Sequence, residues 1–568
     1  MRGAVVAVLI VLAVLALSGQ GIGILKHTPV SVVSDWTQRH VIFSQPDSIG
    51  VIIDISRDPR YWQQQWRRYA VAAAAGRVGL QGAASLSLQG VAVPNRPAPA
   101  GGRDWSVSLG GASVRPQSFP AKFTFDVTTP PSCTADFVVT GINGTPGSGQ
   151  ANIIGLNRLY TNASGTGYCP TATGPAFMFA YSVGSGPVPA AVVLSLDGKK
   201  VAYSENNGAS TYFHVLTYAT GTGNGTDATH PVVPGTGNTA TDSRVLLGET
   251  TTTTPFVDYL RDVAYVTTTT HVHKIAGVFK GTPTEVTGGT SGWPVTMTGA
   301  AGLSTPVFDQ VTRHVFYKDF NGIVYYIDDS VSPAVLSSTT FAVTSGNDGS
   351  SRPVIVDSTR GKIYAASNGA TGTYSVIGQA DTSLGSQVRV NVGSADANGA
   401  TSFGPDLNNA YYAGPLSSAY LYAVGNDRSG NLRPALYRIG FTTGWVMSST
   451  THDGPILLTT ATAAAGVRAS PLTEFYNTGT TPAKDFLFAG ITDSCSTGVT
   501  GGCIRSIDIT DPATFPTATS VNTVILGAAG GTSGITVDNV ATCTGCSSVY
   551  YVTLTGNTLV KATQAGLL

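Results

Sequence analysis

Short apolar runs alternate with turn residues along most of the chain, in a phrase that recurs about eight times between residues 120 and 560. At 305–319 the phrase reads TPVFDQVTRHVFYKD, which is an apolar run, an aspartate, a few turn residues and a second apolar run. Runs of Val, Ile, Phe and Tyr split by Asp, Gly and Asn predict β-hairpins. Because each run is almost continuously apolar, we expect both faces of these strands to be buried.

A third apolar run usually follows each hairpin, so each unit supplies three strands and often a looser fourth. An acidic residue marks the hairpin turn at intervals of roughly 50 to 70 residues. The marker acids are Asp126, Asp197, Asp258, Asp309, Asp357, Asp406, Glu474 and Asp538. This period predicts an all-β fold, a β-propeller of about seven to eight four-stranded blades with a small N-terminal strand/helix extension.

The last unit shows no fourth apolar run before Leu568. A propeller must close to protect its sheet edges, so the missing strand is expected from the N-terminal side. The stretch DWSVSLGG at 104–111 fits that role. We therefore expect the propeller to span 104–568, and truncation at either end to open the ring.

The residues before the propeller divide into three segments. Residues 1–18 resemble a signal peptide, with a cationic start and an apolar run, and no Cys follows that would indicate a lipoprotein. Residues 19–90 predict short strands and a helix at 58–75, and 91–103 read as a Pro- and Gly-rich linker. Cleavage would leave the protein in the periplasm or outside the cell. In the alternative, the uncleaved N-terminal segment anchors the chain in a membrane.

The number and distribution of charged residues bear on whether the protein binds nucleic acid. Lys and Arg total 32, Asp and Glu total 32, and charged residues are only 11% of the chain. Because no basic stripe occurs in the sequence, we do not expect nucleic acid as a partner.

Six cysteines in an exported chain predict disulfides. The expected local pairs are Cys133 with Cys169, Cys495 with Cys503, and Cys543 with Cys546. The last pair has CxxC spacing, which can serve redox chemistry or metal binding. Since it lies in a turn between two strands and not at a helix N-terminus, we favour a small loop staple.

The recurring acids are candidate binding residues. If they lined the channel, their carboxylates would form a ring able to bind cations. In the alternative interpretation each aspartate caps the hairpin turn that follows it. The candidates at the channel mouth are Asp197, Asp258, Asp309, Asp357 and Asp406.

His271 and His273 are weak candidates for a metal site. Two residues apart on an expected strand, they face the same side, and two imidazoles on one face can begin such a site. The sequence identifies no third ligand. It also contains no nucleophile elbow, HExxH or phosphate-binding loop, so we assign no catalytic residue and no cofactor.

The stretch Ser195–Tyr203, SLDGKKVAY, resembles the SPDG signature of TolB-type propeller repeats, with Leu196 in place of the proline. The region from Asp104 onward resembles a family of uncharacterised exported bacterial propeller proteins. The resembling pieces are DWSVSLGG, PAKFTFDVTTPPSC, DFVVTG, VLSLDGKKVAY and GGTSGITVDN. That family carries no established activity, so the resemblance implies the fold and no site residues.

These observations favour a secreted or periplasmic binding or scaffold module for protein partners or envelope glycans, because rigid propellers display long loops. An extracellular lyase or glycosidase with its site at the channel mouth is the alternative, and it would need paired carboxylates. A structural subunit joined through the helix at 58–75 is a third interpretation.

Overall fold

A computed structural model describes residues 41–43 and 102–563, all within one compact unit, Ser31–Leu568. The gaps within it are 125–130, 145, 147–148, 162–166, 170–173, 260, 299–301, 310, 341–352, 359, 369–373, 395–403, 414, 430, 461, 478–483, 497–498, 500, 518–520, 522–523, 539–545 and 547. The predicted signal peptide, the helix at 58–75 and nearly all of the linker lie outside the described residues, and the domain boundaries stay a prediction.

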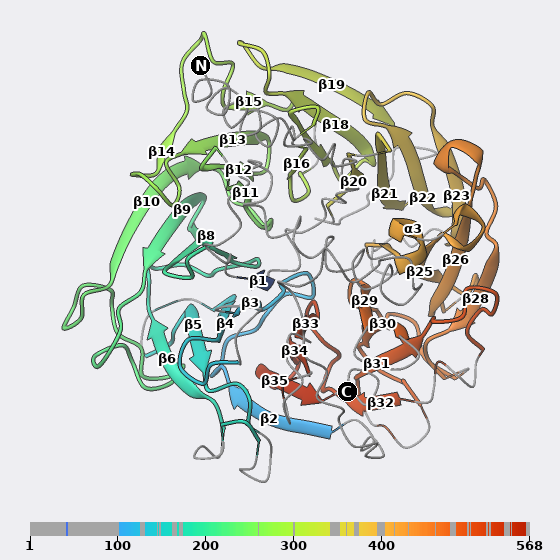
Figure 1. Ribbon diagram of the computed structural model, residues 1–568. Coiled ribbons are helices and arrows are strands. Elements are labelled where there is room, and N and C mark those ends of the chain that lie inside the picture. The colour runs from blue at the N-terminus through green and yellow to red at the C-terminus, as the bar shows by residue number, and fades with distance from the viewer. Residues whose placement is uncertain are drawn as a thin grey trace, which may run out of the picture. The chain divides into compact units, whose positions relative to one another are not determined.

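The described strands form eight sheets arranged in a ring, which confirms the propeller prediction (Figure 1). Blade 1 comprises β3 (Ala121–Thr124), β4 (Phe137–Gly141), β5 (Ile153–Asn157) and β6 (Ala176–Tyr181). Blade 2 comprises β7 (Val193–Leu194), β8 (Lys200–Asn207), β9 (Ser210–Thr217) and β10 (Thr241–Gly248). Blade 3 comprises β11 (Phe256–Asp258), β12 (Val263–Thr267), β13 (His271–Ala276), β14 (Thr284–Glu285) and β15 (Val295–Thr296). Blade 4 comprises β16 (Val307–Phe308), β17 (His314–Lys318), β18 (Ile323–Asp328) and β19 (Val335–Thr340).

The second half of the ring repeats this order. Blade 5 comprises β20 (Ile355–Asp357), β21 (Lys362–Asn368), β22 (Tyr374–Asp381) and β23 (Val388–Ser394). Blade 6 comprises β24 (Asp406–Leu407), the short helix α3 (Asn409–Ala413), β25 (Tyr420–Asn426), β26 (Pro434–Thr442), β27 (Val446–Met447) and β28 (Asp453–Leu457), with 3-10 turns at Leu416–Ser418 and Thr443–Trp445. Blade 7 comprises β29 (Thr473–Asn477), β30 (Lys484–Ile491), β31 (Cys503–Asp508) and β32 (Val524–Gly527). Blade 8 comprises β33 (Thr536–Asp538), β34 (Ser548–Val552), β35 (Thr558–Thr563) and β2 (Gly102–Ser108).

Blade 8 is completed from the N-terminal side, as predicted. Strand β2 pairs antiparallel with β35 and is the outermost strand of the sheet. Trp105 of β2 is buried, and its indole N–H donates to the carbonyl of Leu159 in blade 1 at 3.0 Å. The closing strand therefore holds both the last blade and the first.

A second N-terminal strand joins the ring in a way that the sequence did not predict. Strand β1 (Val41–Phe43) pairs in parallel with β3, on the edge of β3 away from β4. Because the first strand of each blade lies nearest the centre of the ring, β1 makes an innermost fifth strand of blade 1 (Figure 1).

The near-continuous apolar runs are buried on both faces, as expected. Every residue of the central strands β4, β12 and β34 is buried. Their side chains pack between consecutive blades, for example where Tyr265 of β12 stacks on Phe308 of blade 4. Burial on both faces follows because each sheet is stacked against two neighbours.

Two of the predicted disulfides are confirmed. Cys133 is bonded to Cys169, and Cys495 is bonded to Cys503. Cys546 is disulfide-bonded, while Cys543, its predicted partner, lies outside the described residues. Disulfides fit a protein that folds outside the cytoplasm.

Candidate functional site

The predicted acids hold the turns that follow the inner strands. Asp309 accepts hydrogen bonds from the backbone N–H groups of Val311 at 3.2 Å and Thr312 at 3.1 Å. Asp357 accepts from the Arg360 backbone at 3.1 Å and pairs with its guanidinium at 2.9 Å. These contacts are those of a turn-capping aspartate.

The same acids also tie neighbouring blades together. Asp309 accepts from the hydroxyl of Ser358 in blade 5. Asp357 accepts from the Tyr411 hydroxyl in blade 6 at 2.6 Å, and Asp406 accepts from the backbone N–H of Glu474 in blade 7 at 2.5 Å.

Two further marker acids have local roles, whereas Asp538 is buried and pairs with Lys122 of blade 1 at 3.0 Å. Asp258 pairs with Arg261, three residues along, at 2.9 Å. Asp197 is exposed and accepts from the Ser195 hydroxyl and the Lys199 N–H within its own turn. Asp126 lies outside the described residues. The structure thus places the five candidate residues one to a blade. Four of them are engaged by their own turns, namely Asp197, Asp258, Asp309 and Asp357. Asp406 instead accepts from the N–H of Leu407 in its own strand and from Glu474 of the next blade.

His271 and His273 lie on one face of β13, as the strand period predicts, and their rings are 5.9 Å apart. Each ring faces a carboxylate that sequence reasoning missed. His271 Nδ1 lies 3.2 Å from Glu249, and His273 Nδ1 lies 2.6 Å from Glu285. Both glutamates come from other segments, where no local pattern links them to β13.

Polar neighbours hold this pair in place. Burial alone would raise the pKa of Glu249, but hydrogen bonds from Thr270 and His271 lower it to about 2. His273 Nε2 contacts the Thr268 hydroxyl at 3.1 Å. Within the part of the chain that the structure describes, no group of three or more His, Cys, Asp or Glu side chains is placed to hold a metal ion.

Exposed apolar side chains gather on blade 4. The large hydrophobic residues exposed within the described ranges are Tyr168, Val233, Leu246, Val311, Val331, Val335 and Leu336. Four of these seven belong to blade 4, and their exposed fractions are 66% for Val311, 45% for Val331, 51% for Val335 and 39% for Leu336. We call these four residues the blade 4 patch. Single exposed apolar residues are ordinary, but several on one blade make that blade the candidate interaction surface.

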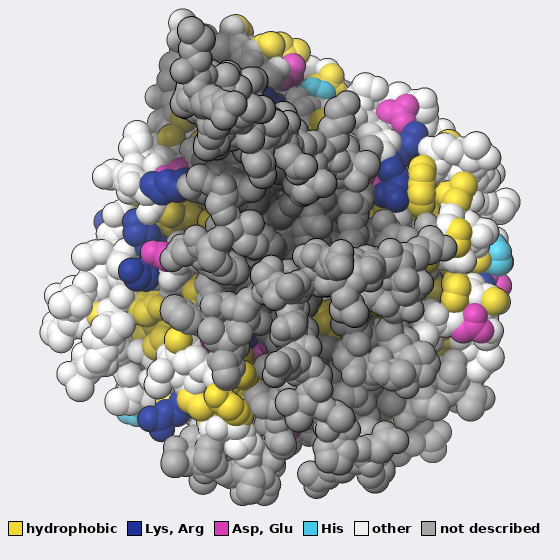
Figure 2. Space-filling model, in the orientation of Figure 1, with side chains coloured by type: hydrophobic (Ala, Val, Ile, Leu, Met, Phe, Trp, Pro, Cys, Tyr) yellow, Lys and Arg dark blue, Asp and Glu magenta, His cyan; other side chains and the backbone are white. Residues whose placement is uncertain are grey.

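The patch occupies one end and the outer rim of its blade. Val311 lies in the β16–β17 turn, Val331 lies in the β18–β19 turn, and β19 is at the rim of the ring (Figure 1). The two turns share one end of the sheet, where Arg313 donates to the carbonyl of Asp329 at 2.8 Å. On the face in Figure 2, the described rim carries hydrophobic side chains and charges of both signs in separate spots.

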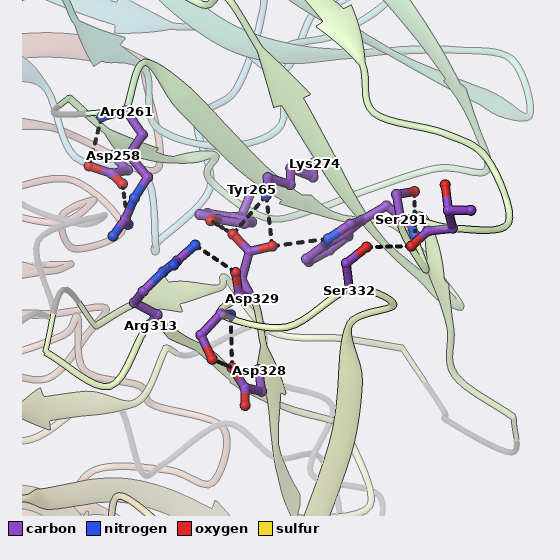
Figure 3. A network of polar contacts seen from close by, with 12 residues as sticks. Asp258, Arg261, Tyr265, Lys274, Ser291, Arg313, Asp328, Asp329 and Ser332 are labelled. Carbon is purple, nitrogen blue, oxygen red and sulfur yellow. Dashed lines mark hydrogen bonds and ion pairs between the residues drawn. The ribbon is translucent and has the colours of Figure 1, made fainter.

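A buried aspartate fixes the β18–β19 turn against blade 3 (Figure 3). Asp329 pairs with Lys274 at 2.7 Å and accepts from the Tyr265 hydroxyl at 2.8 Å and the Trp293 indole at 3.1 Å. All three donors belong to blade 3. Burial, and then the neighbouring Asp329, raise the pKa of Tyr265, so its hydroxyl stays a donor.

Two further contacts complete this attachment. The Ser332 hydroxyl donates to the carbonyl of Thr290, and the Ala334 N–H donates to the carbonyl of Ser291 at 3.1 Å. The turn is therefore held on both sides of Val331, whose side chain is left in solvent. Such prior fixation reduces the entropy lost when a partner binds.

Replacing Asp329 by Ala is expected to lower the free energy of unfolding by about 3–5 kcal/mol, because Lys274 would lose its partner in a poorly solvated site. Urea unfolding followed by tryptophan fluorescence measures this change. Asp328→Ala is the matched control, since the hydrogen bonds of Asp328 come from the exposed Ser330 and their loss should cost about 1 kcal/mol. Equal losses in the two variants would contradict the role given to Asp329.

Among the described residues, no helix is both long and apolar enough to cross a membrane.

Comparison with known proteins assigns the chain to no family. No family model and no curated protein matches it. BamB from Moraxella catarrhalis is 11% identical, with 82% of this chain and 100% of that chain covered at a TM-score of 0.37. Saccharomyces cerevisiae Sqt1 is 12% identical, with 81% and 99% covered at a TM-score of 0.46. Both TM-scores are low, so these similarities carry no information on the family, ligand or activity of this chain.

Proposed function

We propose that this protein is a periplasmic or secreted β-propeller that binds a protein partner through the blade 4 patch and acts as a scaffold. The observation that carries the proposal is that one blade holds four of the seven large hydrophobic residues found exposed in the described part of the chain. Burying each such side chain against a partner contributes about 1.5–3 kcal/mol before the costs of association.

The chemistry of the patch favours a protein over an envelope glycan. Its side chains are aliphatic and offer no donor or acceptor to sugar hydroxyls. The proposed location rests on the disulfides and on the apolar run near the N-terminus.

Site-specific photo-crosslinking in intact cells tests the proposal. A photoreactive residue at Val331 is expected to give one discrete crosslinked species, whereas the same residue at Val233 or Leu246 of blade 2 should not. Those two positions are matched controls because they are equally apolar and exposed at 54% and 53%. Crosslinks of equal yield at all three positions, or none at Val331, would refute the proposal.

The identified partner is then purified and titrated against the propeller. Val331→Asp and Val311→Asp are each expected to weaken binding at least tenfold, because a charge would be desolvated at the interface. Leu246→Asp should leave the affinity unchanged. Thermal unfolding of all three variants should match the wild type, since each side chain is exposed.

A further inference from the structure

Within the described ranges, no strand pairs with the outer edge of β19. Strand β19 is the last in the order β16-β17-β18-β19 and pairs with β18 along its whole length. An edge strand presents a row of unpaired backbone N–H and C=O groups on its free side. Natural sheets usually protect such an edge with charge, proline, a covering loop or a short strand.

Most other outer strands of this ring show one of these protections. Strand β10 carries Asp242 and Arg244, β23 carries Arg389, and β28 carries Asp453 and Pro455. Strands β14 and β32 have only two and four residues, and β2 carries Arg103 and Asp104.

Strand β6 shows that an uncharged edge can be covered by the chain itself. It has no charged residue, but the loop that follows β9 lies along it. Ala180 donates its N–H to Asn224 at 2.7 Å, and Val232 donates to Ala180 at 3.1 Å. The outer hydrogen-bonding groups of Ala180, near the end of β6, are in this way already satisfied.

Strand β19 has neither charge nor proline in its six residues, VLSSTT. Its first two residues, Val335 and Leu336, belong to the blade 4 patch and point to opposite faces of the sheet. An added strand would meet an apolar side chain on each face, which is how cross-strand pairs stabilise a sheet. We infer that the partner contributes an extended, uncharged segment that adds a strand to β19.

This inference rests on the proposed function and names the chemistry of the partner. A charged residue placed opposite Val335 or Leu336 would be desolvated without a countercharge, so the segment should alternate β-branched and small polar residues. The side chain of Gln387 already donates to the hydroxyl of Thr339. The segment should therefore pair mainly with Val335–Ser338.

The size of the edge argues against a second copy of this chain as the occupant. Six residues of strand extend only about 20 Å. Stable association of two folded proteins typically buries about 1,600 Å², more than one short strand supplies. A flexible segment of another protein can use the edge and also reach Val331 in the adjoining turn.

A labelled six-residue peptide of alternating Thr and Val is the probe. Fluorescence anisotropy with the full chain should show saturable binding. The same peptide N-methylated on alternate amides keeps its side chains but loses backbone donors, so it should bind at least tenfold more weakly. Equal binding of the two peptides, or no binding of either up to about 1 mM, overturns the inference.

Two proline variants locate the edge. The backbone N–H groups of successive strand residues point alternately toward β18 and toward the free edge. One of Ser337→Pro and Ser338→Pro therefore breaks a hydrogen bond to β18, and the other removes only an N–H on the free edge. Thermal unfolding identifies the second variant as the one that keeps its midpoint. That variant should bind the peptide at least tenfold more weakly, whereas Leu246→Asp should bind normally.

The crosslinking at Val331 distinguishes failure of the strand inference from failure of the proposed function. Suppose that Val331 crosslinks a partner, and that the proline variant with the unchanged unfolding midpoint binds this partner as tightly as the wild type does. The strand inference then fails and the proposed function stands. If Val331 gives no crosslink, both fail. A dimer seen by light scattering that the edge proline dissociates would overturn the choice of a foreign segment.

Discussion

A chain that begins at residue 109 is expected to be unfolded at temperatures where a chain beginning at residue 102 is stable. The seven residues that differ are β2, which forms the outer strand of blade 8. Without them β35 loses its outer partner strand and keeps only β34, and the space filled by Trp105 between blades 8 and 1 is emptied. Removal of a buried tryptophan alone typically costs about 3–5 kcal/mol.

The loss of charge pairing adds to this effect. Lys561 is fully buried and pairs with Asp104 of β2 at 2.6 Å. Burial lowers the pKa of Lys561, while Asp104 opposes that shift. Removing one partner of such a pair typically costs about 3–5 kcal/mol. Together these losses are comparable with the whole stability of a domain, which is about 5–15 kcal/mol.

Circular dichroism during heating of the two truncated chains measures the difference. Both lack β1, so the comparison isolates β2. Asp104→Asn in the longer chain should give an intermediate unfolding temperature, because it keeps the strand and removes the charge. Equal unfolding temperatures for the chains beginning at 102 and 109 would show that β2 does not close the ring.

Replacing His214 by Ala is expected to have the second large effect. This buried histidine lies in blade 2 with Nε2 3.0 Å from Glu205 and Nδ1 2.9 Å from Asp242, and its ring stacks on Tyr203. The variant leaves the buried Glu205 without its cationic partner. We expect a loss of about 3–5 kcal/mol in the free energy of unfolding.

The effect should depend on pH in a defined direction. Burial alone would lower the pKa of His214, but the hydrogen bonds that its ring donates to Asp242 and Glu205 raise it above 6.5. A raised pKa stabilises the fold below the unfolded value of about 6.5, and this stabilisation is lost as pH rises through the folded pKa. The wild type should therefore lose stability on the alkaline side, and His214→Ala should not show that loss.

At acidic pH, the stability contributed by Glu205 depends on pH in the opposite direction. Burial alone would raise the pKa of Glu205, but hydrogen bonds from His214 and the Ser185 backbone lower it. Its contribution is present above about pH 4.3 and is lost as pH falls through the folded pKa. The His214–Glu205 pair is thus strongest between these two limits.

Urea unfolding at pH values from about 5 to 9 tests the coupling. His230→Ala is the matched control, because His230 also pairs with an aspartate, Asp227 at 2.8 Å, but its side chain is 74% exposed. An exposed pair contributes about 0–1 kcal/mol. A difference between wild type and His214→Ala that does not vary with pH would contradict the coupling.

The local sequence pattern determined the architecture of this protein. Apolar runs with marker acids recur at the spacing of a four-stranded blade, so the all-β ring, its closure by 104–108 and the two disulfides could be predicted. The strand period also placed His271 and His273 on one face. These features depend on residues that are close in sequence, or on the single requirement that the ring must close.

Only the tertiary structure decided which residues face solvent and which distant groups meet. Val311 follows a marker acid like many other turn residues, and its exposure depends on the neighbouring blade. Asp329 meets Tyr265, Lys274 and Trp293 across separations of 36 to 64 residues. Glu249 and Glu285 reach the two histidines from other segments. A pattern of apolar and polar positions carries no information on such contacts, because they depend on how one sheet stacks against the next.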